Sequence, residues 1–167
     1  MSNIQIQSQK NNIPVIFRRV KRELIDMQKI GIFTDESDVT IIKDDKENFH
    51  IIFKNIKDNR VYNFIIPQNY PFRPPKLEIN YRPYSYYLRF QSEKFREIFN
   101  KYKSRTCFCC DSLLCSHNWG PQIKLSNVMD EVDNFHKQCR EIADRVIIKV
   151  IKRKYLIDDV NILEWLY

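Results

Sequence analysis

The 167-residue sequence has only two glycines and no long apolar run. Phosphate-cradling loops and the turns of dinucleotide-binding folds need several glycines at fixed spacing, so the sequence argues against both kinds of site. No run approaches the ~18 apolar residues that span a bilayer. Residues 1–12 are polar and lack the apolar core of a secretory signal. We therefore expect a disordered lead over residues 1–12, no membrane partner, and a location in the cytoplasm or the nucleus.

The charge balance is basic, with 28 Lys and Arg against 21 Asp and Glu, a formal net charge of +7. The densest basic cluster is Arg18, Arg19, Lys21 and Arg22, and a second is Lys149, Lys152, Arg153 and Lys154. Such clusters commonly form the solvated face of a helix. Neither cluster has the interleaved aromatic residues of nucleic-acid-binding segments, so we expect no nucleic-acid partner.

The hydrophobic pattern predicts an α+β fold in a single domain over residues 13–167. Apolar residues at helical spacing predict a first helix from Pro14 to about Lys29 and a long C-terminal helix that includes residues 128–146. Between them, runs rich in Val, Ile, Phe and Tyr predict a four-stranded antiparallel meander. The predicted strands are Val39–Lys43, Asn48–Ile56, Arg60–Pro67 and Leu77–Tyr81. An extra helix is predicted at Ser92–Tyr102, and a short final helix or turn at Val160–Tyr167.

A proline-rich segment interrupts the predicted sheet. Residues 70–76 read YPFRPPK, with three prolines within five positions. Proline fixes φ and has no N–H to donate, so this segment must leave the sheet in a stiff, extended path. Farther along, Trp119-Gly120-Pro121 precedes the apolar pattern of the long helix.

This order of elements resembles the ubiquitin-conjugating enzymes (the UBC-like fold). Tyr70–Lys76 is similar to the family's YPFxPPK signature, Arg18–Asp26 to its basic first helix, and Trp119–Met129 to its WSPxLxxxxVL helix start. The matches run with interruptions from Pro14 to Val132. The resemblance implies an enzyme that accepts ubiquitin or a ubiquitin-like protein from an activating enzyme as a cysteine thioester. It then passes the modifier to a lysine or a ligase, and needs no cofactor because the activating enzyme uses the ATP.

Four of the five cysteines lie within Cys107–Cys115, which suggests thiol chemistry rather than a disulfide framework. Thiolate is both a good nucleophile and a good leaving group, as acyl exchange requires. Residues 108–113, FCCDSL, fit the family's active-site pattern with Cys109 as nucleophile. In that register Cys110 points inward and Asp111 faces solvent. Cys110 is the other candidate: it lies closer to Trp119, but that register turns Asp111 towards the core, a costly place for a charge.

The family's His-Pro-Asn triplet, whose Asn stabilises the oxyanion or the adjacent loop, is missing. The corresponding positions hold Ser85-Tyr86-Tyr87. Tyr87 is one candidate hydrogen-bond donor in its place, with His117 and Asn118 as others and Asp111 as a further supporting residue. The insertion with the extra helix lies between Tyr87 and the cysteines.

By resemblance, one surface serves both the activating enzyme and the ligase. Its residues are Arg18, Arg19, Arg22, Phe72 and Pro121. For Phe72, packing in the core is the alternative interpretation.

Two alternatives to the enzyme stay open from the sequence. The first is a catalytically inactive scaffold of the same fold that binds ubiquitin or a partner, which the missing triplet favours. The second is a zinc site, with or without that scaffold, because the cysteine segment offers enough soft ligands for tetrahedral coordination. The candidate ligands are Cys107, Cys109, Cys110, Cys115 and His117. Their spacing lacks the usual paired knuckles, so we predict no metal.

Overall fold

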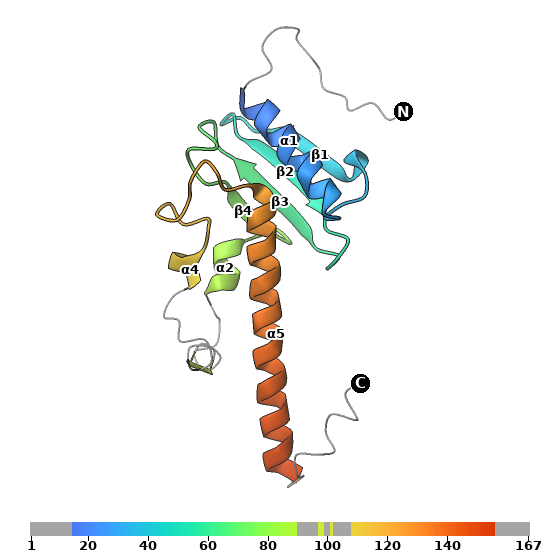
Figure 1. Ribbon diagram of the computed structural model, residues 1–167, viewed down its shortest axis with the longest axis vertical. Coiled ribbons are helices and arrows are strands. Elements are labelled where there is room, and N and C mark those ends of the chain that lie inside the picture. The colour runs from blue at the N-terminus through green and yellow to red at the C-terminus, as the bar shows by residue number, and fades with distance from the viewer. Residues whose placement is uncertain (1–14, 90–96, 99–100, 102–107, 156–167) are drawn as a thin grey trace. The chain divides into compact units, whose positions relative to one another are not determined.

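The computed structural model describes residues 15–89, 97–98, 101 and 108–155 (Figure 1). The chain divides into two compact units, Met1–Phe90 with Cys107–Asp130, and Gln91–Thr106 with Glu131–Tyr167. The prediction of one domain over 13–167 stays a prediction. The expected disordered lead at 1–12 and the short final helix at Val160–Tyr167 lie outside the described residues.

The first unit contains an antiparallel sheet in the order β1-β2-β3-β4-β5. The strands are β1 Val39–Lys43, β2 Phe49–Lys54, β3 Val61–Ile66, β4 Lys76–Ile79 and β5 Arg82–Pro83. The α+β class and the antiparallel meander are therefore confirmed. Each predicted strand is present, the first with the expected ends and the other three with slightly different ones.

The prediction of four strands was wrong, because β5 adds a fifth. Asn80 and Tyr81 both have positive φ, 48° and 63°, as in the two-residue hairpin turns that match strand twist. This turn brings Ile79 opposite Arg82. A strand of two residues, one of them a proline, is too short to show an alternating pattern in the sequence.

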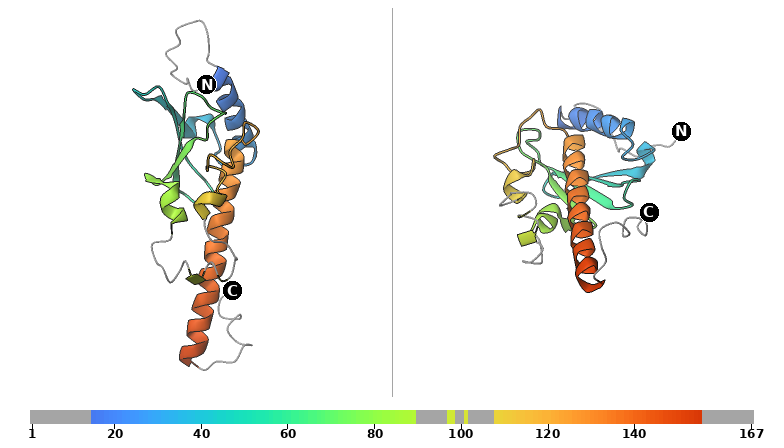
Figure 2. Two further views of the ribbon diagram at one scale, coloured as in Figure 1. Left: turned by 90° about the vertical axis from the view of Figure 1, so that its left-hand side faces the viewer. Right: turned by 60° about the horizontal axis from the view of Figure 1, so that its bottom comes forward.

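The core of this unit lies between the sheet and α1 (Val15–Lys29), which runs across one face of the sheet (Figures 1 and 2). Val20 and Met27 on α1 are buried, and the ring of Phe17 lies 6.4 Å from that of Phe49. Alternate sheet residues point to this face because successive side chains in a strand point to opposite sides. The buried sheet residues are Ile51, Phe53, Tyr62, Phe64, Ile66, Leu77 and Ile79.

The long C-terminal helix is confirmed as α5, Leu125–Tyr155. Its first residues belong to the unit that holds the sheet, where Leu125, Val128 and Met129 are buried. Within the part of the chain that the structure describes, none of the helices has the length and apolar character needed to cross a membrane.

Two short α-helices and the 3-10 helix η1 (Glu36–Asp38) complete the described part of the first unit. α2 (Tyr84–Leu88) follows β5 directly and packs against α4 (Phe108–Asp111), which carries the first cysteines of the described chain. Most of the inserted helix predicted at Ser92–Tyr102 lies outside the described residues. Glu97, Ile98 and Lys101 are described, and each is helical.

Candidate active site

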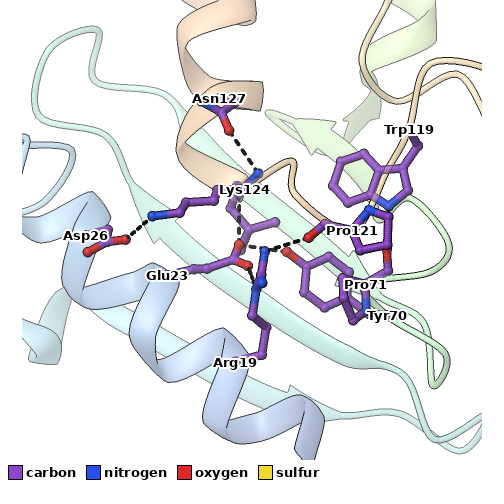
Figure 3. Close-up of polar contacts among 10 residues, drawn as sticks. Arg19, Glu23, Asp26, Tyr70, Pro71, Trp119, Pro121, Lys124 and Asn127 are labelled. Atoms are coloured by element: carbon purple, nitrogen blue, oxygen red, sulfur yellow. Dashed lines mark hydrogen bonds and ion pairs between the residues drawn. The ribbon is translucent and has the colours of Figure 1, made fainter.

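A buried carboxylate connects three segments that are far apart in the sequence. Glu23 on α1 is 2% exposed, and its Oε2 accepts hydrogen bonds from the Tyr70 hydroxyl at 2.7 Å and from the Leu125 amide at 2.9 Å (Figure 3). Its Oε1 accepts a hydrogen bond from Nε of Arg19. Burying a carboxylate is costly unless hydrogen bonds and an opposite charge satisfy it, and Glu23 has both. The carboxylate therefore ties α1 to the proline-rich segment and to the start of α5.

The groups around Glu23 keep their protons. Burial, and then the hydrogen bond to Glu23, raises the pKa of the Tyr70 hydroxyl. The hydrogen bond to Glu23 also raises the pKa of Arg19. Both side chains therefore stay protonated, as donors to Glu23, throughout the physiological pH range.

Trp119 provides a second link to the proline-rich segment. Its indole Nε1 donates a 2.7 Å hydrogen bond to the carbonyl oxygen of Pro71, and its ring lies 6.0 Å from that of Tyr70 (Figure 3). The Tyr70–Pro71 peptide bond is cis. The residues from Tyr70 to Pro75 lie between β3 and β4, in agreement with the predicted exit from the sheet.

The loop after Trp119 is fixed against α1 by main-chain and side-chain contacts. Nη2 of Arg19 donates a 3.0 Å hydrogen bond to the carbonyl oxygen of Pro121. Nζ of Lys124 forms a 2.8 Å ion pair with Asp26, and this interaction lowers the pKa of Asp26 (Figure 3). The amide of Lys124 donates to Oδ1 of Asn127 at 2.9 Å. Arg19 and Asp26 of the first helix thus hold the entry into α5 together with Glu23.

Cys109 and Cys110 lie on the helical turn α4, called the cysteine turn below, which corrects one prediction. Cys109 on α4 is half-buried, Cys110 is exposed, and their sulfur atoms are 4.0 Å apart. The prediction that Cys110 points inward was wrong, because it assumed the alternation of an extended strand. Neighbouring side chains in a helical turn are about 100° apart rather than opposite. Asp111 is exposed, so neither cysteine is disfavoured by a carboxylate turned into the core.

Asn118 supports the cysteine turn through its amide nitrogen. Nδ2 donates to the carbonyl oxygens of Cys110, at 2.6 Å, and of Ser112, at 3.0 Å. The Ser112 side chain is 4% exposed, and its Oγ accepts a hydrogen bond from the Leu114 amide at 3.1 Å. An amide nitrogen has two hydrogens, and both are directed at this turn. Asn118 therefore positions the turn and has no hydrogen left for an oxyanion in this arrangement.

The structure also places the other two predicted oxyanion donors, Tyr87 and His117. The Tyr87 hydroxyl donates a 2.9 Å hydrogen bond to the carbonyl oxygen of Ile79 in β4. His117 is exposed, with Nδ1 3.7 Å from the sulfur of Cys115. As placed here, Tyr87 stabilises the β4–α2 connection, and His117 lies beside a different thiol from the predicted nucleophiles.

The predicted partner surface is exposed at four of its five residues. Phe72 is 78% exposed, so packing in the core is excluded for this side chain. Arg18, Arg22 and Pro121 are exposed as well. Arg19 is half-buried between Glu23 and Pro121, so it holds the loop in place. Contact of these residues with a partner stays a prediction.

A metal site receives no support from the described residues. In residues 15–89 and 108–155 no three His, Cys, Asp or Glu side chains come together as metal ligands would. Cys107, one of the proposed zinc ligands, lies outside the described residues. Cys109, Cys110 and Cys115 form no disulfide bond within the part of the chain that the structure describes.

The role of Glu23 was not predicted from the sequence, although a signal was present. Glu23 stands between Val20 and Met27 on the apolar stripe of the first helix, where a charge is unexpected.

Comparison with protein-family models, curated proteins and solved structures found no match to this chain. What the site does is therefore inferred from its own residues.

Proposed function

We propose that this protein is a ubiquitin-conjugating enzyme that carries ubiquitin, or a ubiquitin-like protein, as a thioester on its cysteine turn. The observation that supports this most is the hydrogen bond from Trp119 to Pro71, at 2.7 Å. It joins two segments, the YPFRPPK stretch and the Trp-x-Pro helix start, whose sequences independently resemble the same family. Glu23 ties both to the first helix, the third segment with that resemblance.

The proposed reaction is transthiolation. A cysteine thiolate of α4 attacks the thioester carbonyl of the modifier on its activating enzyme. The new carbon–sulfur bond forms, the activating enzyme's cysteine leaves as a thiolate, and that thiolate takes up a proton. An acceptor amine then attacks the same carbonyl, an amide forms, and the cysteine of this protein leaves. The exposed position of Cys110 beside half-buried Cys109 gives both large protein partners access to the turn.

The exposed residues around the Trp119 loop support a partner surface. Arg18, Arg22, Phe72 and Pro121 are all accessible, and arginine and aromatic side chains are typical of interaction hot spots. We assign this surface to the activating enzyme and the ligase.

The test is a charging assay with ubiquitin, a ubiquitin-activating enzyme and MgATP, read on non-reducing gels. We expect a new band, larger by one ubiquitin, that disappears on addition of a thiol reductant. The double variant Cys109→Ala/Cys110→Ala should lose the band. Cys139→Ala is the matched control, because burial raises the pKa of that thiol to about 11 and keeps it protonated. A band that persists in the double variant would contradict the proposal.

An inactive scaffold of the same fold is the second candidate. The observation in its favour is that Tyr87 and Asn118 donate to main-chain carbonyl oxygens instead of being directed at a reacting carbonyl. A scaffold would bind ubiquitin or a partner without forming the band. Binding of uncharged ubiquitin in a titration, together with no band under full charging conditions, would favour this candidate.

A further inference from the structure

The cysteine turn holds two thiols, although a thioester needs only one. The sulfur atoms of Cys109 and Cys110 are 4.0 Å apart, which is close to van der Waals contact for two sulfurs. They differ in exposure, since Cys109 is half-buried and Cys110 is exposed. Asn118 fixes the backbone on which the second thiol sits, by its 2.6 Å hydrogen bond to the carbonyl oxygen of Cys110.

This separation suits acyl exchange between the two sulfurs. A carbonyl carbon bonded to one sulfur can approach the other to the ~3–3.5 Å of a near-attack geometry. The exchange replaces one alkyl thioester by another, so it is close to thermoneutral, and neighbouring thiols on one turn react without the entropy loss of a bimolecular step.

We infer that Cys109 and Cys110 are both acyl carriers and that the modifier moves between them after loading, an inference that rests on the proposed function. The Cys110 sulfur attacks the carbonyl carbon of the Cys109 thioester, the new carbon–sulfur bond forms, and the bond to Cys109 breaks. The proton lost by Cys110 ends on the released Cys109 sulfur. Transfer in this direction brings the thioester to the more exposed position, where an acceptor amine has better access.

Differential alkylation maps the acyl group directly. The protein is charged with ubiquitin, the activating enzyme is stopped by chelating magnesium, and free thiols are blocked with light N-ethylmaleimide at successive times. Hydroxylamine then cleaves the thioester, and the thiol it releases is labelled with heavy N-ethylmaleimide. Trypsin gives one peptide, Thr106–Lys124, which contains Cys107, Cys109, Cys110 and Cys115. Fragmentation of that peptide assigns the heavy label to individual cysteines.

We expect heavy label at both Cys109 and Cys110, reaching a constant ratio within about fivefold of unity because the two thioesters are chemically alike. Heavy label at one of the two at all times would overturn the exchange and leave the proposed function standing. No heavy label at any cysteine, in a sample incubated with active enzyme and MgATP, would overturn the proposed function itself.

A second measurement tests the thiol pair without charging. Phenylarsine oxide bridges two neighbouring thiols, so intact mass should show one bound arsenical that survives excess monothiol. Cys109→Ala and Cys110→Ala should each abolish that resistant adduct, and Cys139→Ala should retain it. Single variants that bind the arsenical as the unchanged protein does would show that the two sulfurs do not act as a pair.

Discussion

Tyr70 donates its hydroxyl hydrogen across 2.7 Å to the carboxylate of Glu23, a residue 47 positions earlier in the chain. Both side chains are nearly inaccessible to solvent, at 4% and 2% exposure. The contact joins the proline-rich segment to the first helix at the point where the long helix also begins. This hydrogen bond therefore helps to hold all three segments in place.

Removing this hydroxyl should destabilise the fold. Tyr70→Phe leaves a buried carboxylate with one donor fewer, and we expect a loss of about 1–3 kcal/mol in the free energy of unfolding. Urea denaturation should show a lower midpoint at an unchanged slope. Tyr81→Phe is the matched control, since Tyr81 is 83% exposed. Its effect should stay within about 0.5 kcal/mol. Equal effects of the two substitutions would show that the contact contributes nothing.

Acid should weaken the fold partly through Asp44. The hydrogen bonds from Asn48, whose Nδ2 and amide donate to this carboxylate at 3.0 and 2.8 Å, lower the pKa of Asp44 from 3.8 to about 2. A folded-state pKa below the unfolded value means that this stabilisation is complete above about pH 4. It is lost as the pH falls through 2.

The urea midpoint should therefore fall more steeply between pH 4 and pH 2 in the unchanged protein than in Asp44→Asn. The two proteins should converge towards pH 2. Asp45→Asn, in the same turn, controls for the loss of one carboxylate and should keep the steep dependence. Parallel curves for all three proteins would contradict the role of Asp44.

Asn118 should act on the rate of charging more than on stability. Asn118→Asp replaces the Nδ2 donor by an acceptor that faces the carbonyl oxygens of Cys110 and Ser112, so the cysteine turn should lose its geometry. We expect the initial charging rate to fall about tenfold, equivalent to ~1.4 kcal/mol in the barrier. Asn134→Asp makes the same chemical change at an exposed position of α5 and should charge at the normal rate. A loss of folding in Asn118→Asp, seen by circular dichroism, would instead assign it a purely structural role.

Phe72 should matter for partners and not for folding. Because its side chain is 78% exposed, Phe72→Ala should change the free energy of unfolding by less than about 0.5 kcal/mol. Loss of an aromatic anchor should raise the KM for the activating enzyme roughly tenfold or more in the charging assay. Tyr81→Ala removes an equally exposed ring from a different loop and should leave KM unchanged. A normal KM in Phe72→Ala would remove the support for this surface.

The helices and longer strands were predictable because the pattern of apolar residues along each segment indicates its secondary structure. The first helix was expected from Pro14 to Lys29 and is observed at Val15–Lys29, and the first strand at Val39–Lys43 has the expected ends. The fifth strand was missed because a two-residue strand forms only when a hairpin turn brings it against β4. The orientation of Cys110 was missed for a related reason, since the alternation rule does not hold in a helical turn.

The sequence by itself determined the α+β class, the exit of the chain from the sheet at three prolines, and the gathering of four thiols in one short segment. Each of these depends on residues close together along the chain, where φ restriction and side-chain periodicity act directly. Only the tertiary structure decided that Glu23 accepts hydrogen bonds from Tyr70 and Leu125, and that Trp119 reaches Pro71. It also decided that the Asn118 amide supports the cysteine turn. Such hydrogen bonds depend on which side chains the packed core brings within reach of each other. The spacing of residues along the chain does not identify these partners.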